Sequence, residues 1–296
     1  MVAVDSRNAT FTGRPHAERQ LAEYLEGIAP DLVGGRGLGT RRLAVAEGDF
    51  NLLIFHQVDE AAPWLLFESH LDTAGTEGMT IEPFVARIEG GRIYGRGTCD
   101  TKGSGAAMLW ALSRYAAEGR GPNNVALLFS IDEESGKAGV KAFADRQLAD
   151  LGWKPVGAIV GEPTELRLVV AHAGIVRWSI RTHGLAAHSA DPSRGRSAIS
   201  MMTRVIQAIE SRYIPHLRAR HPLVGKAQCS INMIRGGTQV NMIPDLCEIW
   251  LDRRLVPGED PQQVLPEVKR VLDALKEEMP HLAYSMSEAF IDPPLD

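Results

Sequence analysis

Four clusters of histidine and acidic residues lie at the ends of apolar, strand-like runs between residues 65 and 162. They are His70 and Asp72 in LLFESHLDT, Asp100 in IYGRGTCDTKG, Glu133 and Glu134 in VALLFSIDEESG, and Glu162 in AIVGEPTEL. Charged side chains are rarely buried unless something compensates their charge. Four such clusters at strand ends therefore predict divalent cations, in the manner of a two-metal hydrolase site.

The first two clusters also have ordinary explanations when each is taken alone. His70 and Asp72 are two residues apart on a predicted strand, so their side chains leave the same face. Asp72 could orient the His70 ring or lie slightly behind the site, and a solvated strand end is the simpler alternative. Asp100 lies in a glycine-rich turn, where a carboxylate can bridge two cations or cap a helix or turn.

The other two clusters favour the metal site because they recur on successive strands. Glu133 and Glu134 are adjacent at a strand end and can point in different directions, so one could bind metal while the other acts as a general base. A solvated acidic loop is the alternative, but it does not explain Glu162 at the end of the next strand. One imidazole with several carboxylates suits zinc, cobalt or manganese.

Composition places the chain among ordinary globular proteins and excludes several partners. The 296 residues are 44% hydrophobic and carry a net charge of −5, with no long basic run, so nucleic-acid binding is not indicated. The N-terminus has no apolar core of signal-peptide length, and no apolar run approaches the roughly 18 residues of a membrane-spanning helix. Cys99, Cys229 and Cys247 are scattered and suggest no disulfide framework. We expect a cytoplasmic protein that does not contact membranes.

The elements that must position these clusters alternate between strands and helices. Apolar runs predict strands at residues 51–58, 63–70, 125–132 and 156–163, and helical patterns cover 16–26, 103–119 and 137–150. A glycine-rich turn is expected at 33–42, without the spacing of a phosphate-binding loop. This alternation predicts a layered α/β domain.

A second pattern begins near residue 174. Strands are predicted at 174–184, 227–237, 245–255 and 281–290, with helices at 196–214 and 260–280. The order strand, helix, strand, strand, helix, strand is that of an α+β ferredoxin-like module. We therefore expect domains at 1–174 and 175–290, followed by a linker at 291–296.

The motifs SHLDT, YGRGTCDTKG, DEESGKAG and GEPT together resemble, in order, those of the M20 family of metallopeptidases and deacylases. That family includes acetylornithine deacetylase, succinyl-diaminopimelate desuccinylase, aminoacylase and carboxypeptidase G2, and the resemblance covers nearly the whole chain. It implies two zinc ions per subunit, the first held by His70, Asp100 and Glu162, the second shared through Asp100 with Glu134. It further implies Glu133 as general base, Asp72 as the partner of His70, and a cis peptide bond between Asp100 and Thr101.

The second domain resembles the family's lid and dimerisation domain. In GLAAHSADPSRGRSAI, the resemblance implies that His188 reaches the active site of a partner subunit and stabilises the oxyanion there. In RGGTQVNMIPDLCEIWLDRR, it implies that Asn241 and Arg254 bind a free carboxylate of a small-molecule substrate. Taken alone, His188 would be a loop histidine and Arg254 a surface arginine.

The family pattern continues past the lid with one more metal-binding histidine, whereas this sequence ends at Asp296. His281 lies in the lid, so we expect a complete first metal site, a second with only Asp100 and Glu134, and a chain that is a fragment. The expected function is hydrolysis of an amide bond in an N-acyl amino acid or small peptide by metal-activated water, as in a deacetylase or desuccinylase. The alternative is a truncated or degenerate, non-catalytic homologue that binds at most one metal and dimerises through its lid.

Overall fold

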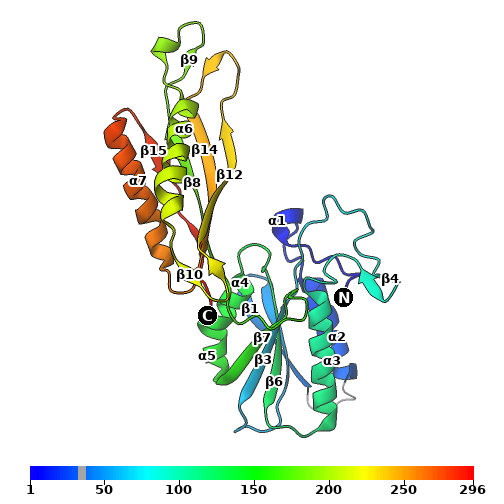
Figure 1. Cartoon of the computed structure of the whole chain (residues 1–296). Helices are drawn as coiled ribbons and strands as arrows, with labels where there is room; N and C mark the ends of the chain where they lie inside the picture. Colours follow the sequence, from blue (N-terminus) through cyan, green and yellow to red (C-terminus); the bar gives the residue numbers. More distant parts are fainter. Residues whose placement is uncertain (33–37) are drawn as a thin grey trace. The chain divides into compact units, whose positions relative to one another are not determined.

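A computed structural model describes residues 1–32 and 38–296 (Figure 1). The chain divides into two compact units, Met1–Leu166 and Arg167–Asp296. The domain boundary expected at residue 174 falls at the first residue of β8 (Gly174–His183), inside the second unit. The expected linker at 291–296 begins within β16 (Phe290–Asp292), which pairs with β8.

The first unit is built on a five-stranded sheet in the order β1-β2-β6-β3-β7. Its strands are β1 (Leu38–Ala46), β2 (Asp49–His56), β6 (Asn124–Ser130), β3 (Trp64–His70) and β7 (Pro155–Val160). The last three are parallel, whereas β1 and β2 are antiparallel to their neighbours. Every residue of β6 is buried, as expected of an apolar strand that is covered on both faces.

Helices cover both faces of this sheet (Figure 1). On one face lie α2 (Arg19–Leu32) and α3 (Lys102–Glu118), and on the other lie α4 (Ala138–Ala142), a π-helical turn at Phe143–Gln147, and α5 (Leu148–Leu151). The short helix α1 (Ala9–Thr12) has no buried residue and belongs to neither core cluster. Leucines of α2 and α3 pack with Leu52 and Leu127, while Phe143 packs on the opposite face with Leu53 and Leu128. The predicted layered α/β fold is thus confirmed. A short hairpin, β4 (Arg87–Glu89) and β5 (Arg92–Tyr94), precedes α3.

One local prediction in this unit was partly wrong. The glycine-rich stretch 33–42 was expected to be a turn, but its residues from Leu38 onward belong to β1. They are extended because they pair with β2 along its whole length, and such long-range pairing overrides local turn preference. Residues 33–37 of that stretch lie outside the described residues.

The second unit has a five-stranded antiparallel sheet, in which four strands follow the order β12-β14-β8-β15 and the fifth, β16, also pairs with β8. Its elements are β8, α6 (Ala198–Ala208), β12 (Gln228–Gly236), β14 (Leu246–Leu255), α7 (Val264–Glu278), β15 (Tyr284–Met286) and β16. This order and connectivity confirm the ferredoxin-like prediction. Alternate residues of β8, including Val176, Trp178 and Ile180, form the core with α6 and α7. The intervening Arg177 and Arg181 lie on the other face of the sheet.

Two short strand pairs complete the second unit. They are β9 (Ala187–His188) with β13 (Met242–Ile243), and β10 (Arg220–His221) with β11 (Gly225–Lys226). Across the described part of the chain, no helix combines the length and the apolar character that crossing a membrane requires.

Candidate metal centre

The parallel strands of the first unit deliver the predicted ligands to one edge of the sheet. His70 is the last residue of β3, Glu133 and Glu134 follow β6, and Glu162 follows β7. Because β3 runs parallel to both β6 and β7, their carboxyl ends lie at the same edge. Ligand sites of open α/β sheets form at this edge.

Asp72 fixes the orientation of the buried His70 ring. The ring Nδ1 lies 2.9 Å from the backbone oxygen of Asp72 and 3.4 Å from its Oδ1. Both oxygens only accept, so Nδ1 carries a hydrogen and Nε2 faces Asp100 Oδ1 at 2.9 Å. Burial acts to lower the pKa of His70, but hydrogen bonds to Asp100 and Asp72 outweigh it and raise the pKa to about 11. A cation at this place would take the position of the Nε2 proton.

The same Asp72 carboxylate also holds the acidic loop. Its Oδ1 accepts the backbone N–H of Glu133, and its Oδ2 that of Glu134, both at 3.0 Å. Burial acts to raise the pKa of Asp72, but bonds from His70, Asn8 and Glu134 prevail and hold it below its usual value. Asp72 therefore lies behind the site as an anion that joins His70 to the acidic loop.

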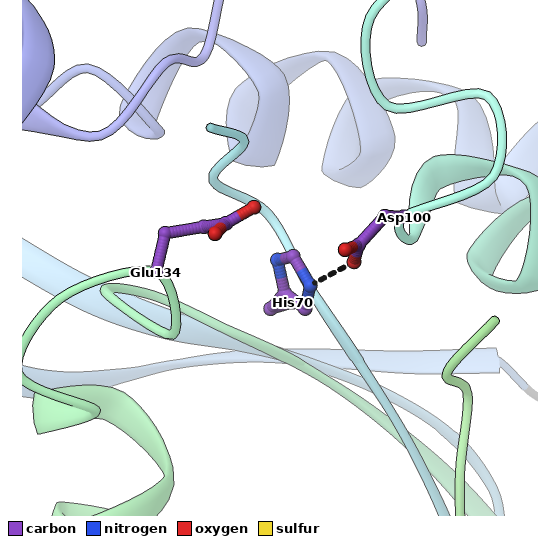
Figure 2. A group of neighbouring side chains, drawn as sticks. All are labelled: His70, Asp100 and Glu134. Atoms are coloured by element: carbon purple, nitrogen blue, oxygen red, sulfur yellow. Dashed lines mark hydrogen bonds and ion pairs between the residues drawn. The ribbon is translucent and has the colours of Figure 1, made fainter. Parts of the chain in front are cut away.

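Three of the predicted ligands converge within reach of one ion (Figure 2). Ligand atoms of His70, Asp100 and Glu134 all lie within 4.8 Å of one another. The peptide bond between Asp100 and Thr101 is cis, which confirms the prediction. Burial raises the pKa of Glu134, and the charge of Asp100 adds to this effect. Two carboxylates and an imidazole nitrogen in so small a space fit a divalent cation, which would relieve their repulsion.

Glu162 and Glu133 lie near this group but outside it. The resemblance implied that His70, Asp100 and Glu162 bind one ion. Among the described residues, however, the carboxylate that lies close to both His70 and Asp100 is that of Glu134. Partial burial of its carboxyl, together with the charges of Asp100 and Glu133, raises the pKa of Glu162 to about 7 although the residue is largely exposed. Glu133 Oε1 lies 3.8 Å from Lys137 Nζ.

Sequence reasoning missed several polar residues around the site. Glu68 accepts a hydrogen bond from Ser130 Oγ at 2.5 Å, and burial raises its pKa. Its position two residues before His70 on β3 was a usable signal, because both side chains leave the same face. Asn8 donates a hydrogen bond to the Asp72 carboxylate. Glu18 lies near enough to Asp72 for the charge of Asp72 to raise its pKa. They gave no signal, since only the tertiary fold brings the N-terminal segment here.

The predicted substrate residues lie at two ends of the second unit. His188 is in β9 and pairs with Met242 of β13, while Ser189 N–H donates to the backbone oxygen of Asn241 at 2.9 Å. Arg254 lies at the far end of β14 and donates to Asp252 Oδ1 at 2.6 Å. The structure thus brings His188 and Asn241 together and leaves Arg254 apart.

The two adjacent arginines of β14 differ sharply in exposure. Arg253 is 2% exposed, donates to Glu259 Oε1 at 2.5 Å and contacts the hydroxyl of Tyr213. Arg254 points to the opposite face, where it is exposed. Of the two, only Arg254 is available to a ligand.

The chain is thus a two-unit α/β protein. Its layered unit carries a histidine and carboxylate cluster at the strand ends, and its second unit is ferredoxin-like. The sequence matches the profile described as peptidase family M20/M25/M40 over residues 66–269. This chain therefore belongs to that family.

Similar curated proteins include deacetylases and peptidases. The chain is 32% identical to an acetylornithine deacetylase of Pectobacterium carotovorum over 87% of its own length and 66% of the relative's. It is 31% identical to a probable carboxypeptidase of Aspergillus oryzae (73% and 51%) and 35% identical to a peptidase M20 domain-containing protein of Schizosaccharomyces pombe (60% and 42%). The chain thus spans between about two fifths and two thirds of these relatives.

Solved structures share the fold at low identity. An M20 family metallo-carboxypeptidase of Sulfolobus solfataricus matches with a TM-score of 0.76 and 19% identity, over 99% of this chain and 77% of the other. Human carnosine dipeptidase 1 matches with a TM-score of 0.68 and 16% identity, over 99% and 76%.

Proposed function

We propose that this chain is a metal-dependent hydrolase that cleaves an amide bond in an N-acyl amino acid or small peptide. The convergence of His70, Asp100 and Glu134 on one small space, with Asp72 anchoring His70 and the acidic loop behind them, carries this proposal. Family membership supports it, and the relatives named acetylornithine deacetylase and carboxypeptidase favour these substrates. Deacetylase or desuccinylase chemistry is our specific expectation.

His70, Asp100 and Glu134 would hold a divalent cation. We propose Glu162 as a further carboxylate ligand, because its charge interacts with those of His70 and Asp100. Such a cation, when bound, acidifies water and polarises an amide carbonyl. Zinc suits one imidazole with carboxylates, and cobalt or manganese would also fit. We propose that Asp100 and Glu134 would also serve as ligands of a second ion.

Glu133 is the proposed general base. Asp72 fixes the backbone of Glu133 by accepting its N–H. Glu133 adjoins the proposed ligand Glu134 in the chain but is not itself part of the ligand group. From this position it would take a proton from the attacking water and deliver it to the leaving amine.

Residues of the second unit would bind the substrate as part of a homodimer. Asn241 and His188 are neighbours, but the ten residues of β14 separate them from Arg254 by roughly 30 Å at about 3.3 Å per residue. A small substrate cannot contact all three in one copy. We therefore propose that two copies contribute, one with Arg254 for the substrate carboxylate and the other with His188 for the oxyanion.

The free thiols of Cys99, Cys229 and Cys247 agree with the expected reducing cytoplasm.

Metal analysis combined with an amidase assay tests this proposal. We expect Glu133→Gln to retain its metal and lose at least about 100-fold in kcat, since a general base contributes about that much or more. His70→Ala should lose both metal and activity, whereas Glu118→Gln at the end of α3 should change neither. The non-catalytic alternative predicts at most one metal and no turnover, and that result with a panel of N-acyl amino acids would overturn the proposal for this chain.

A further inference from the structure

We propose that Asn8 is a positioning residue for the metal centre, which it serves by tying the N-terminal segment to the acidic loop. The inference rests on the proposed function, because it assumes that the centre binds a cation. Asn8 precedes α1 and is 1% exposed. It lies outside residues 66–269, the range in which the chain matches the family profile.

Every polar atom of the Asn8 side chain has a partner. Its Nδ2 donates to Asp72 Oδ2 at 2.9 Å and to Asp132 Oδ1 at 3.0 Å. Its Oδ1 accepts the backbone N–H of Thr10 at 2.9 Å and so caps α1. Rotating the amide by 180° would set its oxygen against two carboxylates, so these contacts define the orientation.

The two carboxylates that Asn8 joins hold the acidic loop from both sides. Asp72 accepts the backbone N–H groups of Glu133 and Glu134. Asp132 Oδ2 accepts those of Gly136 at 3.1 Å and Ala138 at 3.2 Å, which closes the loop onto itself. Like charges so close repel each other, and the Asn8 amide offsets this by donating to both.

The N-terminal segment is anchored independently of the Asn8 side chain. Thr73 N–H donates to the Ser6 backbone oxygen at 3.1 Å, and Asn8 N–H donates to the Thr73 oxygen at 2.9 Å. The Ser6 hydroxyl donates to the Leu71 oxygen at 2.7 Å. Removing only the Asn8 amide should therefore leave the segment in place while it releases the bridge between the two carboxylates.

Loss of the Asn8 bridge should lower the affinity of the metal centre for a cation. Glu134 enters the ligand group from a loop whose backbone is fixed by Asp72, and Asp72 also orients His70. When the bridge is lost, both ligands become less well ordered before the cation arrives. Loss of such supporting contacts typically costs about 10–100-fold in metal affinity.

The test compares Asn8→Ser with Asn124→Ser in the full chain. Serine at position 8 still caps α1 but cannot reach two carboxylates with two donors. Asn124 is a matched control because it is fully buried, bonds to Asp59 and Ala62 through Nδ2, and begins β6 at the end of the sheet away from the site. Zinc affinity is measured by competition with a chromogenic chelator, well below the unfolding temperature of each protein.

We expect Asn8→Ser to bind zinc about 10–100-fold more weakly than the wild type, while Asn124→Ser loses thermal stability but keeps its zinc affinity. Equal affinity in Asn8→Ser and the wild type would overturn this inference and leave the proposed function intact. An equal loss in both variants would also overturn it, since the effect would then be general destabilisation. A wild type that binds no zinc would overturn the proposed function, and this inference with it.

Discussion

Glu18 adds a further carboxyl behind the acidic loop. It is 7% exposed on the chain just before α2. Its burial, with the nearby charges of Asp72 and Asp49, raises its pKa to about 7, although backbone hydrogen bonds from its own N–H and that of Asp132 oppose the shift. A buried acid of this kind is costly in its charged form.

We predict that Glu18→Gln stabilises the protein at pH 8 but not at pH 4.5. Between pH 4.5 and about 7, folded Glu18 keeps a proton that the unfolded chain has released, so the wild type loses stability as the pH rises through this range. Glutamine keeps an acceptor oxygen and carries no charge. The expected gain at pH 8 is about 1–3 kcal/mol by urea unfolding with a chelator present.

Glu23→Gln is the control for this prediction because Glu23 is exposed on α2. It should change stability by less than about 0.5 kcal/mol at either pH. If Glu18→Gln gave no greater gain at pH 8 than at pH 4.5, the buried Glu18 carboxyl would not be the proton that the folded state retains.

Residue patterns predicted the candidate ligands but not the residues whose hydrogen bonds hold them in place. His70, Glu134 and Glu162 were recognisable because each follows an apolar strand, and the parallel strands bring their ends together. Asn8 could not be predicted, since no local pattern reveals that a residue sixty-odd positions earlier completes the bonding of Asp72. The amide–carboxylate contact exists only in the folded chain.

At the scale of elements, α3 determines where Asp100 stands relative to His70. The helix begins at Lys102, directly after the turn that carries Asp100. It packs closely against the sheet at Gly105, where an added Cβ would lie 2.7 Å from Ser69 Oγ and 3.0 Å from a Phe129 ring carbon. The small residue at this position allows the start of the helix to approach the end of β3.

We therefore predict that Gly105→Ala destabilises the protein by about 1–3 kcal/mol, because the methyl group forces α3 away from β3 and β6. The matched control is Gly27→Ala in α2, where a Cβ would meet nothing within 4 Å. That change should stabilise by about 0.5–1 kcal/mol through helix propensity. Chemical unfolding of both variants provides the measurement. Equal and favourable effects would show that α3 does not pack against β3 as tightly as the structure indicates.

Element order was largely predictable, and element length less so. The ferredoxin-like order followed from one strand-and-helix succession, and β8 and β14 alternate as a half-buried sheet requires. The helix expected at 137–150 is instead interrupted by a π-helical turn at Phe143–Gln147. Gln147 in that turn donates to the Ala44 oxygen and bonds Asn51. Such tertiary contacts leave no periodic trace in the sequence.

At the scale of the whole molecule, each unit has a core of its own, and the first unit also has an apolar edge strand. The second unit encloses its core between α6, α7 and one face of its sheet. The first ends its sheet at β7, an edge strand without a charged residue, on which Val156, Ile159 and Val160 are exposed. An apolar cavity of about 250 Å³ lies elsewhere in this unit, between α3 and the strands β3 and β6.

We predict that residues 167–296 fold alone, and that residues 1–166 self-associate through the β7 edge. The separate second unit should unfold in one cooperative transition, since its core lies within one compact unit. The separate first unit should bind an apolar fluorescent dye strongly and sediment as oligomers, because an uncharged edge strand pairs readily with others. Val156→Lys within 1–166 places a charge on that edge and should reduce the association without lowering the unfolding temperature. A monomeric, dye-free 1–166 would show that the β7 edge is not adhesive, and an unfolded 167–296 would show that the second unit requires the first.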